Sequence, residues 1–442
     1  MWLLPIFSPL SRFALRVFYR LDVTGERVPS RGPVLLVANH PNSLLDPAAV
    51  VAVAGRPVRF LAKAPLFDDG QVGWLVRGAG AIPVYRKQDD PAAMSGNDDT
   101  FRAAHEALAA GDAVGIFPEG ISHTSPSLAP LKTGAARIAL GAAARIGGAF
   151  PVVPVGLVFR EKESFRSEGM LVVGEPVAWD DLAARGEGDR AAVGELTDRI
   201  DEAIRRVTIN LDRWEDAPLL EAAEGIFSAE TPTDPSPAAR VRRMREAAAS
   251  LARLRHDERG PWTALAHEVA EHARSLEVLG MTPEQLRAGN RADLAARWIV
   301  RQLVFFALGV PISAVGTILF FIPYRATRPA AALTKPSHDM QATTKLLLGS
   351  VIHLVWIVAL AAVAGWRVGI LAGLAALLVL PAIGLVTLHV RDRWQRATGE
   401  ARRFILRARR RRTLDELRAR QRELAKRLNA LWEETREPLA LP

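Results

Sequence analysis

A histidine and an aspartate stand close together where a short apolar run ends. Residues 34–38 are all apolar, His40 follows two positions later, and Asp46 comes after five more residues. A buried strand that ends in a turn with an imidazole, with a carboxylate nearby, is a common way to build a general base and the acid that orients it. We therefore consider His40 a candidate catalytic base and Asp46 its partner.

Both residues also have plain structural interpretations. Asp46 precedes Pro47, and aspartate is a favoured helix N-cap just as proline is favoured at the first helical position. A lone histidine at the end of a strand is more often structural than catalytic. Because six positions place two residues on different faces of a straight helix, we expect His40 in the turn and Asp46 at the helix start, where it serves as cap and orienting acid at once.

Apolar runs of strand length recur along the first half of the chain and alternate with helical segments. This alternation predicts a three-layer α/β domain, in which polar residues at the strand ends converge on one edge of the sheet. The expected strands are residues 34–38, 58–61, 78–84, 113–117, 151–158 and 170–173.

Four short segments carry the polar residues that could converge there. They read NHPNSLLD at 39–46, GAIPVYRK at 80–87, FPEGISH at 117–123 and VVPVGL at 152–157. Each is weak taken singly. Together they resemble, in order and spacing, the four motif blocks of the glycerolipid (phospholipid/glycerol) acyltransferases of bacteria and eukaryotes, whose catalytic domain residues 32–177 would cover.

The resemblance implies an O-acyltransferase of phospholipid biosynthesis. It would move a fatty acyl group from acyl-CoA or acyl-carrier protein to a hydroxyl of glycerol 3-phosphate or 1-acyl-glycerol 3-phosphate. His40 would be the general base and Asp46 would stabilise its imidazolium, as in a triad. No enzyme nucleophile is needed for direct transfer, in agreement with the absence of cysteine. An acyl-enzyme on Ser43 stays open as an alternative, and neither a cofactor nor a metal ion is expected.

The resemblance also assigns residues to substrate binding. Arg86 would pair with the acceptor's phosphate, for which a bidentate guanidinium is suited. Glu119 and Gly120, in the third block, would shape the acceptor site. The full substrate-binding set is Asn39, Arg86, Glu119, Gly120, His123 and Lys132.

Two features depart from the commonest form of the family. Five residues rather than four separate His40 from Asp46, which resembles a branch of fungal glycerol-3-phosphate/dihydroxyacetone-phosphate acyltransferases and their bacterial relatives. The third block, which usually continues Thr-Arg-Ser after its glycine, continues here with Ile121, Ser122 and His123. Because its arginine is missing, Arg86 would share the phosphate with His123 or Lys132.

Three long apolar runs, at 303–323, 346–366 and 368–390, predict an integral membrane protein. A helix needs roughly 20 apolar residues to cross the hydrocarbon core, and each run is long enough. Basic residues between the first and second runs and after the third favour the cytoplasmic side. We therefore expect a cytoplasmic-membrane protein with its catalytic domain on the cytoplasmic face, a hairpin turning near Arg367, and a re-entrant first run bent near Pro311.

The chain therefore divides into five predicted regions: an amphipathic N-terminal helix at 1–22, the α/β domain at 23–188, a helical region at 189–298, the membrane domain at 299–392 and a basic helical tail at 393–442. Leucines at heptad spacing in the tail favour either a short coiled coil or a helix lying on anionic lipid. The net charge of +9 does not indicate nucleic-acid binding, because a basic cluster follows a membrane hairpin directly. No feature indicates an oligomeric state.

Three functional hypotheses follow. The first is the membrane-bound acyltransferase, whose partners would be membrane lipids, an acyl thioester donor and a phosphorylated glycerol, with another lysophospholipid or lipid acceptor as a variant. The second is a non-catalytic lipid-binding scaffold of the same fold. The third is a metal-dependent hydrolase with His40, Asp46 and His123 as ligands, which no metal-binding spacing supports.

Overall fold

The computed structural model describes residues 4–70, 73–85, 97–159, 161–254, 261–287, 292–334, 340–409 and 411–435. The chain forms two compact units. The first comprises residues 1–214, 236–248 and 337–343, and the second comprises residues 215–235, 249–336 and 344–442.

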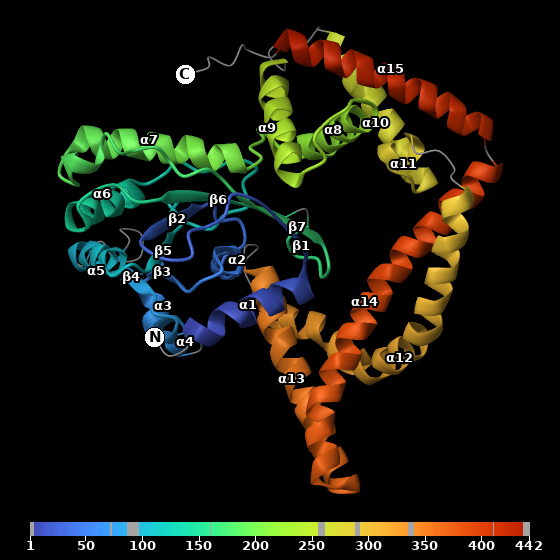
Figure 1. The fold of residues 1–442 in the computed structure, drawn as a ribbon, viewed down its shortest axis with the longest axis horizontal. Helices are drawn as coiled ribbons and strands as arrows, with labels where there is room; N and C mark the ends of the chain where they lie inside the picture. Colours follow the sequence, from blue (N-terminus) through green and yellow to red (C-terminus); the bar gives the residue numbers. More distant parts are fainter. Residues whose placement is uncertain are drawn as a thin grey trace. The chain divides into compact units, whose positions relative to one another are not determined.

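A seven-stranded sheet forms the centre of the first unit, with the strand order β1-β7-β6-β2-β5-β3-β4 (Figure 1). Neighbouring strands are parallel except for the antiparallel pair β6 and β7. All five residues of β2 are buried, as expected for a central strand covered on both faces. The strands are β1 Arg20–Gly25, β2 Val34–Ala38, β3 Val58–Lys63, β4 Ile82–Val84, β5 Ala113–Ile116, β6 Val152–Phe159 and β7 Glu168–Val173.

Helices cover both faces of this sheet, so the predicted three-layer α/β architecture is confirmed. Leu35 and Val37 of β2 share one apolar core with α5 (Asn97–Ala109), α6 (Gly134–Ile146) and α7 (Arg190–Val207). Side chains alternate along a strand, so the residues between them face the opposite layer. That layer contains α2 (Leu45–Ala54) and α1 (Leu4–Phe18), which pack on each other (Figure 1).

Local predictions failed at three places in this unit. The helix expected at 1–22 is shorter, because α1 ends at Phe18 and is followed by β1, a strand that was not expected and that pairs in parallel with β7. The strand expected at 78–84 is limited to β4, because α4 (Gly73–Gly78) ends at its first residue and a turn follows, in which the Ala81 N–H donates to the Val76 carbonyl at 3.2 Å. Helix α3 (Pro65–Asp68) precedes α4. Asp46 is not an N-cap, because α2 already begins at Leu45 and the Asp46 carboxylate accepts the N–H of Asn42, upstream of the helix.

The second unit contains a bundle of α8 (Ala217–Glu230), α10 (Pro261–Leu279), α11 (Pro283–Arg287) and α15 (Arg411–Thr435). Leu424 and Leu428 of α15 are buried against Ile226 and Val269. The leucine face of the tail is therefore covered by other helices of the same chain, which contradicts a separate coiled coil. Contact of the charged face of the tail with anionic lipid stays a prediction. The helical region predicted at 189–298 is shared, because α7 and most of α9 (Pro237–Leu254) belong to the first unit.

Three further helices of the second unit are long and apolar enough to cross a membrane: α12 (Ala292–Leu333), α13 (Gln341–Val368) and α14 (Ile370–Arg409). α13 and α14 are separated only by Gly369, whose φ of 126° suits a tight turn, at the place where the hairpin is expected. The membrane hairpin itself stays a prediction.

The first run lies in α12, which is one continuous helix containing Pro311. Gly316 of α12 allows close packing on α14, because a Cβ atom there would lie 2.0 Å from the Oγ1 atom of Thr387. The re-entrant course of this run stays a prediction.

Candidate active site

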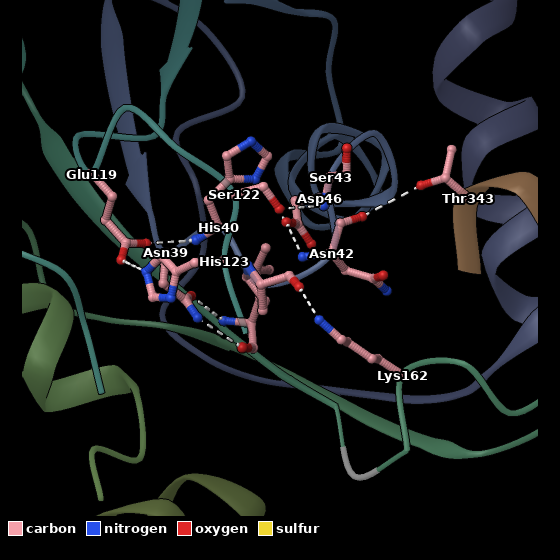
Figure 2. Close-up of polar contacts among 12 residues, drawn as sticks. Asn39, His40, Asn42, Ser43, Asp46, Glu119, Ser122, His123, Lys162 and Thr343 are labelled. Carbon is pink, nitrogen blue, oxygen red and sulfur yellow. Dashed lines mark hydrogen bonds and ion pairs between the residues drawn. The ribbon is translucent and has the colours of Figure 1, made fainter. Parts of the chain in front are cut away.

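The two central parallel strands bring the first and third motifs together. β2 and β5 pair in register, with Val37 opposite Ile116, so the segments that follow them leave the sheet at the same edge. Directly beyond β5, Phe117 stacks on the imidazole of His40, with ring centroids 4.1 Å apart and planes 11° apart. The backbone N–H of His40 donates to Glu119 Oε1 at 2.8 Å. The segment that follows β5 thus contacts both the ring and the backbone of His40. Figure 2 shows the hydrogen bond to Glu119.

His40 and Asp46 form the expected pair. The distance from His40 Nδ1 to Asp46 Oδ2 is 2.8 Å, and the aspartate is fully buried. The same Oδ2 atom accepts the backbone N–H of Asn42 at 2.7 Å. Because Nδ1 must donate to the carboxylate, the neutral ring carries its lone pair on Nε2. Among the residues described, none hydrogen-bonds to that Nε2 atom, and the side chain is 19% exposed.

The environment of Asp46 affects how readily His40 binds a proton. Burial raises the pKa of the Asp46 carboxyl, while the hydrogen bonds from His40 and Asn42 and the positive charge of Lys162 act in the opposite direction. A buried carboxylate is stabilised most strongly when an adjacent group becomes positive. The carboxylate therefore favours an imidazolium at His40, which is what a general base becomes when it accepts a proton.

A second histidine–carboxylate pair, His123 and Glu119, lies beside the first (Figure 2). His123 contacts Glu119 through Nε2, and its Nδ1 atom accepts the N–H of Ser125 at 3.1 Å. Glu119 Oε2 also accepts the N–H of Ala129 at 2.8 Å. Both carboxylate oxygens of Glu119 and both ring nitrogens of His123 are thus bonded within the protein. The backbone N–H of His123 in addition donates to the His40 carbonyl at 3.2 Å.

The extra residue between His40 and Asp46 is accommodated by a left-handed turn. Ser43 has a φ of 49°, a conformation uncommon for residues other than glycine. Its N–H donates to Ser122 Oγ at 3.0 Å, and Lys162 Nζ donates to the Pro41 carbonyl at 2.7 Å. The first four residues of the five-residue interval therefore form a braced loop, and the fifth, Leu45, is the first residue of α2.

The hydroxyl group of Tyr19 also contacts this loop. Its hydroxyl accepts a hydrogen bond from Asn42 Nδ2 at 2.9 Å and donates to the Lys162 carbonyl. Burial raises the pKa of Tyr19, so the phenol remains a neutral donor. Sequence reasoning missed Tyr19, Ser122 and Lys162. Ser122 lies within the third motif, but no spacing signal connects Tyr19 or Lys162 with the loop.

The other residues predicted to bind substrate differ in what they contact. Asn39 forms two hydrogen bonds with the backbone of Leu157, at 3.0 and 2.8 Å, and so joins the end of β2 to β6. Gly120 has a φ of 71°, and a Cβ atom there would lie 2.8 Å from Lys132 Nζ, so the glycine makes room for that ammonium group. Arg86 lies outside the described residues.

Two alternatives lose support from the geometry. The hydroxyl of Ser43 donates to Met340 Sδ at 2.7 Å rather than to His40, which disfavours a serine nucleophile activated by His40. Within the part of the chain that the structure describes, no three His, Asp or Glu side chains are grouped so as to hold a metal ion.

Comparisons with known proteins find similarity to acyltransferases. Residues 20–158 match the model of the Acyltransferase family. Glycerol-3-phosphate O-acyltransferase 2 of Saccharomyces cerevisiae is 31% identical over 231 residues, which cover 51% of this chain and 31% of the yeast protein. The 1-acyl-sn-glycerol-3-phosphate acyltransferase of Bacillus subtilis is 27% identical over 190 residues, covering 42% of this chain and 87% of that protein.

Among solved structures, the 1-acyl-sn-glycerophosphate acyltransferase of Thermotoga maritima is similar to 46% of this chain over 77% of its own length, with 22% identity and a TM-score of 0.34. The chain spans less than a third of the yeast relative's length.

Proposed function

We propose that this chain, whose residues 20–158 match the model of the Acyltransferase family, is a membrane-bound enzyme that transfers a fatty acyl group to a hydroxyl of a phosphorylated glycerol. The observation that carries the proposal is the His40–Asp46 pair, in which the buried acid fixes the tautomer and leaves Nε2 as the basic atom. The names of the yeast and Bacillus relatives support glycerol 3-phosphate or 1-acyl-glycerol 3-phosphate as the acceptor.

The reaction needs one base and no enzyme nucleophile. His40 Nε2 takes the proton from the acceptor hydroxyl as its oxygen attacks the carbonyl carbon of the acyl thioester. The new C–O bond forms, the C–S bond breaks, and the departing sulfur receives the proton from the imidazolium. Asp46 stabilises that imidazolium throughout, and a base positioned in this way typically contributes roughly 10²–10⁴-fold to the rate.

The acceptor's phosphate needs a cation near this edge of the sheet. Lys132 is exposed, and its ammonium group lies next to Gly120. His123 is poorly suited to this role, because its Nδ1 atom accepts a backbone N–H and its Nε2 atom contacts Glu119. We therefore assign the phosphate to Lys132 together with Arg86, and we assign Glu119 and His123 to holding the His40 loop.

Purified full-length protein in lipid vesicles provides the test. We expect it to move label from a long-chain acyl-CoA or acyl-carrier protein to glycerol 3-phosphate or 1-acyl-glycerol 3-phosphate. Lys132→Gln should raise the KM for the phosphorylated acceptor by roughly tenfold, because it removes one charge-assisted contact. A protein that transfers acyl groups to neither acceptor from either donor would contradict the proposal.

A further inference from the structure

The loop between His40 and Asp46 has a further set of contacts, from residues some 300 positions later in the chain. Ser43 Oγ donates to Met340 Sδ at 2.7 Å, and Thr343 Oγ1 lies 3.5 Å from the carbonyl oxygen of Asn42, toward which it donates. Figure 2 shows Thr343 reaching toward Asn42. Thr343 is 1% exposed, so its hydroxyl has been taken out of water to make this contact. Buried hydroxyls normally have a partner, and here the partner is the catalytic loop.

These contacts fall on the two residues that shape the loop. Asn42 holds Asp46 through its backbone N–H, and Ser43 adopts the left-handed conformation that accommodates the extra residue. A backbone in that region persists only where its surroundings maintain it. Ser122 contacts Ser43 from the third motif, and Met340 contacts the same residue through its side chain. Movement of Met340 or Thr343 would therefore reach the His40–Asp46 pair through Asn42.

The bracing residues lead directly into an apolar helix. α13 begins at Gln341 and is long and apolar enough to cross a membrane. Its uncharged run starts at Leu346, three residues after Thr343. At a helical rise of about 1.5 Å per residue, this is a distance of about 4.5 Å along the axis.

We propose that residues 340–343 are a positioning element of the acyl-transfer site, which braces the loop between His40 and Asp46. The inference rests on the proposed function, because it assigns these residues an effect on acyl transfer. It explains why a polar residue, Thr343, is buried so close to the start of an apolar run.

The kinetic test compares three variants of the full-length protein in vesicles. Thr343→Val keeps the shape of the side chain and removes its hydroxyl, so kcat should fall by about three- to tenfold while the KM values for both substrates stay unchanged. Thr343→Ser keeps the hydroxyl and should restore kcat. Thr327→Val is the matched control, because the Thr327 hydroxyl bonds the Pro323 carbonyl one turn earlier in α12. This variant should behave as the wild type.

A second measurement separates this inference from the proposed function. Hydrogen exchange at the Asn42 amide should be about three- to tenfold faster in Thr343→Val than in the wild type or Thr327→Val, because the N–H···Asp46 bond opens more often. Unchanged exchange and kcat in Thr343→Val would overturn the inference, as would a Thr343→Ser variant as impaired as Thr343→Val. Absence of acyl transfer in the wild type would instead refute the proposed function, and exchange would still decide whether residues 340–343 brace the loop.

Discussion

Two histidine–carboxylate pairs lie at the same edge of the sheet, and they differ in the ring nitrogen that contacts the acid. His40 uses Nδ1 and keeps Nε2 for a substrate, whereas His123 uses Nε2 and accepts a backbone N–H on Nδ1. Only the first ring can take a proton without breaking a bond to the protein. Proximity to a carboxylate therefore does not identify a base; an available second nitrogen does.

The two carboxylates differ in a corresponding way. Among the described residues, Asp46 Oδ1 is buried without a hydrogen-bond partner, so this acid is incompletely satisfied and depends on its neighbours for charge stabilisation. Glu119 accepts three N–H groups, from His40, His123 and Ala129. We infer that Asp46 acts in the reaction by stabilising the imidazolium, and that Glu119 maintains the structure of the loop. Substitutions of each residue test this difference.

Asp46→Asn should have the largest effect. The amide oxygen can still accept the two hydrogen bonds, but the negative charge beside the imidazolium is lost. An interaction of about 4 kcal/mol, typical of a charge pair at this distance near a protein surface, corresponds to a kcat lower by about 10²–10³-fold. Steady-state kinetics of Asp46→Asn against the wild type measures it. A decrease in kcat of less than about tenfold would show that the negative charge of Asp46 does not stabilise the transition state.

The same variant has a pH-dependent effect on stability. Burial raises the pKa of Asp46 above its ordinary value of 3.8, so the folded state favours the protonated acid. The stability that this group contributes is fully present below pH 3.8 and is lost as the pH rises through the folded-state pKa. The free energy of unfolding of Asp46→Asn relative to the wild type should therefore rise as the pH is raised above 3.8. Chemical denaturation at several pH values would show an opposite trend if His40 outweighs the burial.

Glu119→Gln should show the reverse balance. In either orientation of the new amide its NH₂ group faces a backbone or ring N–H, so one buried donor loses its acceptor. The free energy of unfolding should fall by about 1–3 kcal/mol, and kcat should fall by only about tenfold as the His40 loop loosens. A large loss of kcat at unchanged stability would instead place Glu119 on the substrate, as the family resemblance implies.

Tyr19→Phe should have the smallest effect. It removes the hydroxyl between Asn42 and Lys162, and the free energy of unfolding should fall by about 1–2 kcal/mol with a change in kcat of only a few-fold. Tyr324→Phe, at a side chain that is 49% exposed, is the control and should leave both quantities unchanged. Equal effects of the two substitutions would remove Tyr19 from the account.

The sequence allowed the three-layer fold and the His40–Asp46 pair to be predicted, because both depend on local patterns. Apolar runs of strand length and a short interval between two polar residues are visible along the chain. The braces of the loop are not, because Tyr19, Lys162 and Thr343 are ordinary residue types that meet Asn42 or its neighbours only after the chain has folded.

The misread tail has a similar cause. The spacing of its leucines indicates an apolar face on a helix, but it does not indicate what covers that face. In the structure α8 and α10 cover this face. The buried Gln421 forms hydrogen bonds with His272 and Glu230. Likewise, the pattern H-x₅-D indicates two groups of the right chemistry but not the left-handed Ser43 that brings them together.

The central claim is that His40 is the base and His123 is not. The most direct measurement is kcat for acyl transfer by His40→Ala and His123→Ala, two matched truncations at residues whose backbones are joined by a hydrogen bond of 3.2 Å. We expect His40→Ala to lower kcat by at least roughly 10²-fold and His123→Ala by about tenfold or less. Full activity in His40→Ala, or an equal loss in both variants, would contradict the account.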